Sequence, residues 1–253
     1  GIYQQIEGYN FADLNWGSAN AKTVTVSFWV RSSLTGTMGG AFYNNDGSRS
    51  YPFTYVINSA NTWEYKTITI PGATGGTWSP NQNAGLQLIF GLGYGSTYLG
   101  SAGAWTTNSV YSSTGSTNLV GTNGATFYIT GVQLEVGTQA TNFDVRDYGR
   151  ELQMCQRYYW KWNSESTASA YLCGAFGYGT TQAYGVLKLP VTMRTAPTIA
   201  KTGTWTTLGG GGTAGSSLSN DQITTKNAQL GCTGGSGGTS GQASVLRASN
   251  DTT

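Results

Sequence analysis

The sequence predicts an all-β protein, an antiparallel sandwich followed by a second, smaller β domain rich in glycine. Three observations support this fold class. Apolar residues alternate with polar ones in several segments, which is the period of a strand with one buried face. Glycine-rich turns separate these segments, and no helical crossover lies between them. Only 9% of the residues are charged but 38% are hydrophobic, so the chain can still bury a core.

The alternation is clearest in four segments of the first part of the chain. In 22–31, apolar and polar positions alternate: Val24, Val26, Phe28 and Val30 on one face, and Thr23, Thr25, Ser27 and Trp29 on the other. Segments 63–70 and 86–92 repeat the pattern. In 127–136 the alternation slips by one residue, so we expect a β-bulge at Gly131.

The composition changes near Phe143, where we expect a domain boundary. Seven of the 24 acidic and basic residues lie in 144–161. Leu152, Cys155 and Tyr159 follow helical spacing and predict a short helix. The sequence therefore divides into a first domain at 1–146, a short helical linker at 147–160 and a C-terminal β domain at 161–253. The linker charges either form local ion pairs in solvent or lie at a junction between neighbouring subunits.

The C-terminal domain has two predicted strands, at 168–176 and 181–189. Pro190 cannot donate to a ladder, so the second strand lies at an edge or ends there. Beyond Pro197 the chain is glycine-rich, and no lysine follows these runs in P-loop spacing. We therefore interpret the glycine runs as turns and loops.

Several classes of function are disfavoured by composition. The net charge is +2 and the basic residues are scattered, which argues against nucleic acid as a partner. No apolar run approaches the ~18 residues of a membrane span, so no membrane insertion is expected, and no signal peptide opens the chain. The sequence contains 0 histidines, which removes the commonest general base and zinc ligand. Cys155, Cys173 and Cys232 are expected to be small buried residues.

Three stretches carry a resemblance to a known family. They are Phe-Tyr-Ile-Thr-Gly-Val-Gln-Leu-Glu-Val-Gly at 127–137, Ala-Thr-Asn-Phe-Asp at 140–144 and Glu-Leu-Gln-Met-Cys-Gln-Arg-Tyr-Tyr at 151–159. With them the chain resembles the carbohydrate-binding-module-like jelly roll and following C-terminal domain of phage tail fibre proteins. The resemblance implies a virion protein that acts outside the host cell and binds host surface polysaccharide or lipopolysaccharide. It also implies contacts with other virion tail proteins and assembly as a homotrimer.

Loop-like segments combine rings with amides and hydroxyls, as sugar-binding surfaces do. The candidate ligand-binding residues are Tyr43, Asn45, Asp46, Tyr51, Tyr94, Tyr98 and Trp105 in the first domain and Tyr178 and Tyr184 in the second. Sugar rings present flat C–H faces that stack on exposed aromatic rings, and polar groups complete the hydrogen bonds. The alternative is that most of these rings are core or subunit contacts.

The sequence supplies no catalytic residues, and we expect a binding protein and not an enzyme. A polysaccharide depolymerase, the alternative, would need two carboxylates about 5 to 10 Å apart. Asp144, Asp147 and Glu151 are interleaved with arginines, which would lower their pKa values. A structural virion decoration or connector protein is the other alternative. No cofactor is predicted, although Glu7, Glu135 and Asp144 would supply oxygens for a structural calcium if the first and last strands met.

Overall fold

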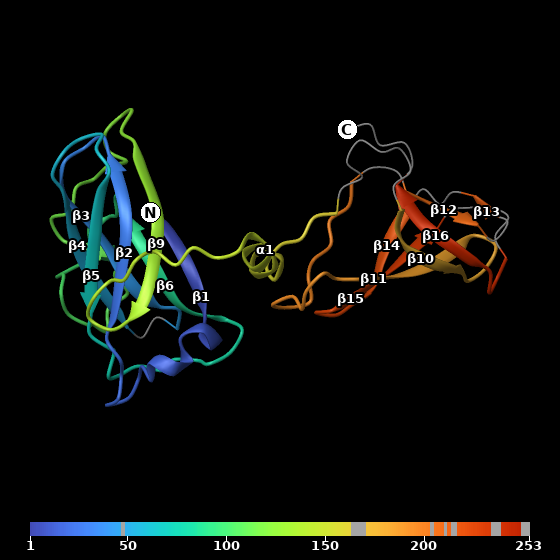
Figure 1. The fold of residues 1–253 in the computed structure, drawn as a ribbon, viewed down its shortest axis with the longest axis horizontal. Coiled ribbons are helices and arrows are strands. Elements are labelled where there is room, and N and C mark those ends of the chain that lie inside the picture. Colours follow the sequence, from blue (N-terminus) through green and yellow to red (C-terminus); the bar gives the residue numbers. More distant parts are fainter. Residues whose placement is uncertain are drawn as a thin grey trace. The chain divides into compact units, whose positions relative to one another are not determined.

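The computed structural model describes residues 1–46, 49–162, 171–202, 205–209, 212–213, 217–233 and 239–248. These residues form a mostly β structure of antiparallel sheets, with a single α-helix in this described part (Figure 1). The chain divides into two compact units, Gly1–Val145 and Arg146–Thr253. No helix of the described residues has the length and apolar character needed to cross a membrane.

The first unit contains two principal sheets. The four-stranded sheet has the order β1 (Ile2–Glu7), β6 (Ala84–Gly91), β3 (Gly36–Asn44) and β4 (Ser50–Ile57). The three-stranded sheet has the order β5 (Glu64–Ile70), β2 (Val24–Ser32) and β9 (Phe127–Val136). Short elements connect them: the 3-10 turns η1 (Gly8–Asn10), η2 (Ala12–Leu14) and η3 (Ser96–Tyr98), and the parallel pair β7 (Leu99–Gly100) and β8 (Ser112–Ser113).

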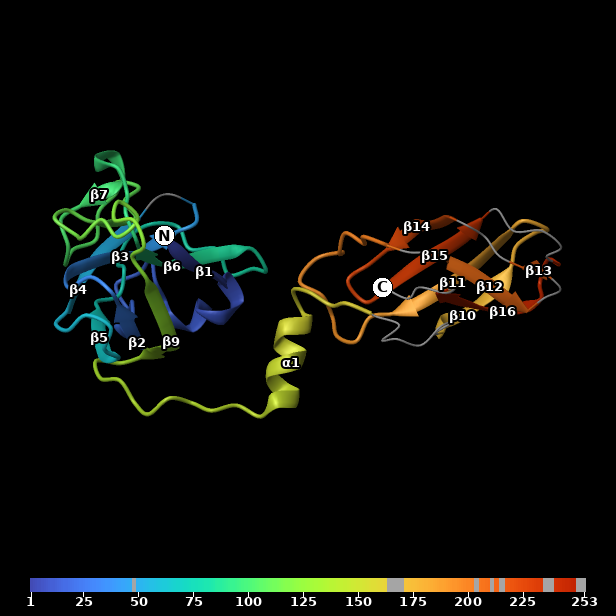
Figure 2. The ribbon, with the colours of Figure 1, turned by 90° about the horizontal axis from the view of Figure 1, so that it is seen from above.

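The core of the first unit lies between these two sheets, which form two layers in Figure 2. The predicted inward row of the 22–31 segment is confirmed, since Val24, Val26, Phe28 and Val30 are all at most 1% exposed. Leu86, Leu88 and Phe90 of β6 face them and are also buried. Period-two alternation therefore identified both faces of the core.

The predicted bulge in the last strand of the unit is confirmed. Gly131 has φ +58° within β9, and the pairing of β9 with β2 shifts between Ser27 and Trp29. The left-handed conformation is inexpensive for glycine, which explains this residue at the slip.

Two polar residues predicted to face solvent are in fact buried. Thr25 and Ser27 are 1% and 2% exposed although they lie on the outer face of β2. The chain after β9 returns over this end of the sheet, and Thr25 Oγ1 donates to the carbonyl of Gly137 at 2.9 Å. Periodicity gave the correct face, but it could not indicate that later residues cover it.

The antiparallel sheets agree with the predicted fold class. Their edges are not joined into a closed barrel, and the jelly-roll arrangement implied by the family resemblance stays a prediction.

The second unit begins with α1 (Tyr148–Gln156), whose N-cap Asp147 accepts hydrogen bonds from the backbone of Gly149 and Arg150. Its sheet has the order β13-β12-β16-β10-β11-β15-β14. The bounds are β10 (Tyr171–Gly177), β11 (Gln182–Lys188), β12 (Trp205–Gly209), β13 (Gly212–Thr213), β14 (Ser217–Ile223), β15 (Asn227–Thr233) and β16 (Ala243–Ala248). The strand before Pro190 ends at Lys188, as its missing donor predicts. A small core is formed by Leu218, Ala228, Leu230, Cys232 and Leu246.

The three cysteines do not share one environment. Cys232 is 2% exposed and packs in this core, as expected. Cys173 is half-buried, and burial raises the pKa of its thiol. Cys155 is exposed on α1, so the prediction of a buried residue is wrong there, because α1 buries none of its residues.

Candidate functional site

Four tyrosines of the first unit form one cluster at its surface: Tyr43, Tyr94, Tyr98 and Tyr111. The rings of Tyr98 and Tyr111 are stacked, with centroids 5.0 Å apart and planes only 8° from parallel. Tyr43 and Tyr94 meet Tyr111 edge-on, at 5.1 and 5.7 Å. Tyr98 is 44% exposed, whereas the other three are half-buried. The tyrosine cluster therefore presents a flat ring whose orientation is fixed by its neighbours.

The cluster is built from a strand and from an irregular segment that covers it. Tyr43 projects from the outer face of β3, and the other three rings belong to residues 92–120, here called the covering segment. Main-chain hydrogen bonds attach this segment to the sheet: Ser50 and Thr106 exchange two, Gly103 N donates to Pro52 O, and Thr117 N donates to Thr37 O. The backbone of Tyr111 donates to the carbonyl of Tyr98 at 2.8 Å, which sets the stacked pair.

A pair of glycines lets the covering segment approach the sheet closely. Gly39 of β3 and Gly91 of β6 are direct cross-strand partners. A Cβ at Gly91 would lie 2.5 Å from Ser112 Oγ, and a Cβ at Gly39 would lie 2.7 Å from Ser113 Oγ. The two serines are 2% and 1% exposed, so they fill the slot that the glycines leave. This contact positions β8 and, directly before it, Tyr111.

Amide groups lie beside the rings. Gln87 of β6 is the cross-strand partner of Tyr43, and its Nε2 donates to Asn45 Oδ1 at 2.7 Å. Asn45 is exposed and Gln87 is half-buried, so each has further donor or acceptor capacity toward solvent. The amide pair therefore lies beside Tyr43 of the cluster and adds hydrogen-bonding groups to its surface.

The hydroxyls of Tyr94 and Tyr111 have raised pKa values. Burial, followed by the neighbouring hydroxyls of Tyr43, Tyr98 and Tyr94, raises the pKa of Tyr111 above its ordinary value. Burial, followed by the nearby Tyr3, raises the pKa of Tyr94. Both groups are therefore neutral and can donate as well as accept.

The structure separates the predicted ligand residues into two sets. It brings Tyr43, Tyr94, Tyr98 and Asn45 together. Asp46 follows Asn45, is exposed, and uses its backbone N–H to bind Asn44 Oδ1 at 2.7 Å.

Tyr51 and Trp105 are a correction to the predicted site. Tyr51 is only 7% exposed, and its ring packs against Trp105 with centroids 5.3 Å apart. The indole N–H of Trp105 is satisfied by the carbonyl of Pro71 at 2.7 Å. Trp105 also meets Trp16 and Trp78 edge-on. Tyr51 therefore belongs to the core and the half-buried Trp105 packs against it, and sequence alone could not distinguish their rings from exposed ones.

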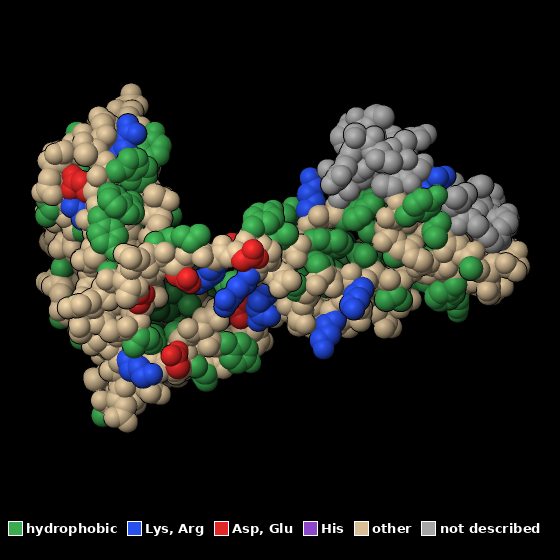
Figure 3. All heavy atoms as spheres, in the orientation of Figure 1, with side chains coloured by type: hydrophobic (Ala, Val, Ile, Leu, Met, Phe, Trp, Pro, Cys, Tyr) green, Lys and Arg blue, Asp and Glu red, His purple; other side chains and the backbone are tan. Residues whose placement is uncertain are grey.

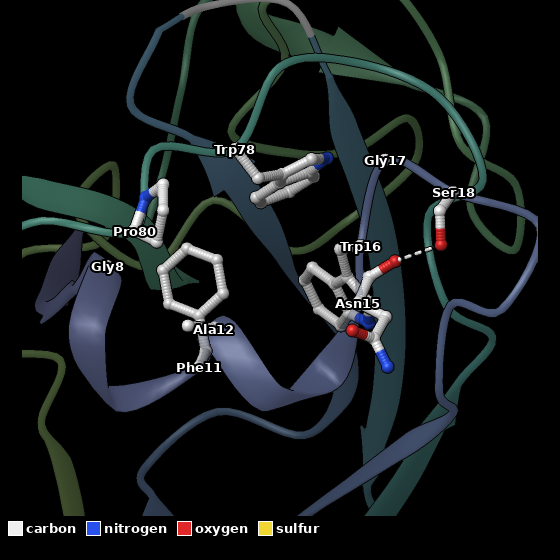
Figure 4. Close-up of a pocket in the computed structure, with 9 residues that line it drawn as sticks. All are labelled: Gly8, Phe11, Ala12, Asn15, Trp16, Gly17, Ser18, Trp78 and Pro80. Atoms are coloured by element: carbon white, nitrogen blue, oxygen red, sulfur yellow. Dashed lines mark hydrogen bonds between the residues drawn. The ribbon is translucent and has the colours of Figure 1, made fainter.

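A pocket of about 270 Å³ lies beside this aromatic packing, at η1 and η2 (Figure 4). Phe11, Trp16 and Trp78 surround it, and the two indole N–H groups donate to the carbonyls of Lys22 and Gly75. Its lining is Gly8, Phe11, Ala12, Asn15, Trp16, Gly17, Ser18, Trp78 and Pro80. This lining has no carboxylate or thiol side chain, and its polar side chains are those of Asn15 and Ser18 besides the two indoles.

In the second unit, Tyr178 and Tyr184 lie together on the β10–β11 hairpin. Their ring centroids are 5.4 Å apart and nearly perpendicular, and Phe176 is the cross-strand partner of Tyr184. Tyr178 is 65% exposed, whereas Tyr184 is half-buried over Gly231. This smaller group of rings has no amide pair comparable to Gln87 and Asn45 among the hydrogen bonds of the described residues.

The carboxylates of the first unit do not assemble into a metal site. Glu7 ends β1 in one sheet, while Glu135 lies on β9 in the other, so the strands on which the calcium site depended are not neighbours. Glu135 binds Thr141, and hydrogen bonds from Thr141 and Gln133 lower its pKa. Among the described residues, no three Cys, Asp or Glu side chains are grouped to hold a metal ion.

Glu64 is also committed to local partners. The hydrogen bond from Lys66, followed by the backbone of Ser59 and by Asn58, lowers its pKa to about 2. A general acid for glycoside cleavage needs a raised pKa, so the shifts at Glu64 and Glu135 are in the opposite direction.

Sequence reasoning missed Tyr111, Gln87 and Tyr3. Tyr111 stands in a serine-rich stretch without alternation, and only its ring type could have marked it. The alternation of Leu86 and Leu88 predicts that Gln87 faces outward. Its pairing with Tyr43 could not be predicted without knowing which strands are neighbours.

No family model matches this chain, and neither a curated protein nor a solved structure matches it.

Proposed function

We propose that the chain is a glycan-binding protein that attaches to bacterial surface polysaccharide through the tyrosine cluster. The observation that carries this proposal is the stacked pair of Tyr98 and Tyr111, with Tyr98 open to solvent and the Gln87–Asn45 amide pair beside Tyr43 of the same cluster. Stacking of Tyr98 on Tyr111 fixes the ring before a ligand arrives, so little side-chain entropy is lost on binding.

The family resemblance extends this proposal. A chain similar to the carbohydrate-binding-module-like jelly roll of phage tail fibres would act as a receptor-binding part of the virion, outside the host cell. It would assemble as a homotrimer with other tail proteins. The low charge and abundant hydroxyl and amide groups are compatible with this role. A structural virion component would have the same surface composition, so a binding experiment is what distinguishes the two functions.

The test is binding of the fluorescently labelled chain to a panel of bacteria with and without their surface polysaccharide. Wild type is expected to bind in a polysaccharide-dependent way. Tyr98→Ala is expected to bind about tenfold more weakly, because aromatic stacking contributes about 0.5–1.5 kcal/mol.

Tyr9→Ala is the matched control, since Tyr9 is 60% exposed on η1 and outside the cluster. Equal binding by both variants, or binding that survives removal of the polysaccharide, would exclude the tyrosine cluster as the site. Release of new reducing ends from the polymer would instead indicate a depolymerase.

A further inference from the structure

The outer face of the β5–β2–β9 sheet carries a second group of exposed rings, here called the aromatic face. Its members are Trp29, Trp63, Tyr65 and Tyr128, which are 44%, 42%, 44% and 49% exposed. Figure 3 views this side of the first unit, and hydrophobic side chains gather over these strands. Large aromatic side chains grouped in this way on a sheet indicate an interaction surface.

The rings form two rows across the sheet. Trp29 and Tyr65 are direct cross-strand partners, with ring centroids 5.3 Å apart. Tyr128 pairs with Arg31 of β2, and Trp63, one position before β5, approaches Tyr128 to 6.5 Å. Residues two apart on a strand are about 7 Å apart, so the rows follow each other along the strands at that interval.

Arg31 gives the aromatic face a positive charge, and none of the described carboxylates forms an ion pair with it. Its guanidinium carbon lies 5.4 Å from the centre of the Tyr128 ring. Its Nε has no hydrogen-bond partner, and no ion pair of Arg31 occurs, among the residues that the structure describes. The acidic groups of these strands, Glu64 and Glu135, are bound to Lys66 and Thr141. An anion from outside the chain would complete the surface.

The size of the face favours a narrow ligand. Three strands spaced about 4.8 Å apart and two rows of rings about 7 Å apart give a face of about 14 Å by 14 Å, or roughly 200 Å². A stable protein interface needs about 800 Å² from each partner. The face is therefore too small to hold a second copy by itself, but it can hold a short stretch of a linear polymer. Thr67 and Thr130 add exposed hydroxyls between the rings.

We propose that the aromatic face is a second glycan-binding surface, selective for sugars that carry a carboxylate. Trp29 and Tyr65 would stack on sugar rings, while Arg31, held over Tyr128, would pair with the carboxylate. This surface is on the opposite sheet from the tyrosine cluster, and its test is independent of that site.

The test is native affinity electrophoresis of the full chain in gels containing polygalacturonate or neutral dextran. Polygalacturonate is expected to retard the wild-type chain more than dextran does. Arg31→Gln is expected to weaken binding to polygalacturonate about tenfold, because a hydrogen bond to a charged group is lost. Trp29→Ala is expected to weaken binding to both polymers, with the melting temperature confirming that it folds.

Lys22→Gln is the matched control for charge. Lys22 is exposed just before β2, nine positions from Arg31 and therefore about 30 Å away along the strand. Equal weakening of polygalacturonate binding by Lys22→Gln and Arg31→Gln would reveal a general charge effect and overturn the proposal. Failure of polygalacturonate to retard the wild-type chain would also overturn it. Concentration-dependent oligomers of wild type that Trp29→Ala abolishes would identify a second copy as the occupant, which also overturns it.

Discussion

Replacing Gly39 with alanine would test how the covering segment is held on the sheet. The added methyl group would lie 2.7 Å from Ser113 Oγ and 2.9 Å from Ser113 N, and Ser112 Oγ is also in its path. Ordinary contacts begin at about 3.4 Å, so the segment must move outward by roughly 0.5–1 Å. The serines are buried, and one of the obstructing atoms belongs to the backbone, so rotating a side chain does not relieve the clash.

The magnitude follows from two opposing effects. Overpacking of this kind costs about 1–3 kcal/mol. Loss of glycine's freedom in the unfolded chain offsets about 0.4–1 kcal/mol of that. A net destabilisation of about 1–2 kcal/mol corresponds to a fall in melting temperature of about 3–6 °C for a unit of this size.

The assay is thermal unfolding followed by circular dichroism, with Gly95→Ala as the control. Gly95 is in the same covering segment, has φ −67°, and a Cβ there would meet nothing within 4 Å. Its alanine variant is expected to melt at the wild-type temperature or slightly above it. An unchanged melting temperature for Gly39→Ala would refute the close contact between the glycine slot and the serines. A displaced Tyr111 should also weaken glycan binding by Gly39→Ala.

Three further predictions concern other parts of the chain. Glu64→Gln should lose about 1 kcal/mol of stability at neutral pH. The pKa of Glu64 is lowered from 4.5 to about 2 in the folded chain, so its contribution to stability is complete above pH 4.5 and disappears as the pH falls toward 2. Unfolding measured across this pH range should therefore show a flatter loss of stability with acid in the variant than in wild type. Gly131→Val should cost about 1–2 kcal/mol in urea unfolding, because a β-branched residue would occupy φ +58°; an unaffected midpoint would contradict the bulge. In the native chain a thiol reagent should modify Cys155 quickly and Cys232 only after unfolding, and mass spectrometry of the labelled peptides would expose the reverse order.

The strands of the first unit were largely predictable because their core is patterned locally. Val24 to Val30 and Leu86 to Phe90 alternate within single segments, and the slip at Gly131 marks its own bulge. Thr25 shows where such reasoning stops. Its burial depends on Gly137, more than a hundred residues later in the chain, and local periodicity does not contain that contact.

The candidate site was only partly predictable for the same reason. Rings and amides in loop-like segments drew attention to Tyr43, Tyr94 and Tyr98, which the structure groups around Tyr111. Tyr51 belongs to the same residue class but lies inside, because β4 turns it toward Trp105. Which aromatic residues are open to solvent is decided by sheet order and by the course of the covering segment, and neither can be read from residue type.

The covering segment is attached to its sheet mainly through main-chain atoms and two small serines, whereas the ring of Tyr98 that it displays is exposed. The side chain at position 98 can therefore be exchanged without disturbing these attachments. The free-energy cost of a new side chain at this position is separate from the cost of folding, so the position can vary while the fold is retained. A library varied at position 98 should keep folded members at high frequency, and under the proposed function these members would differ in their glycan preference.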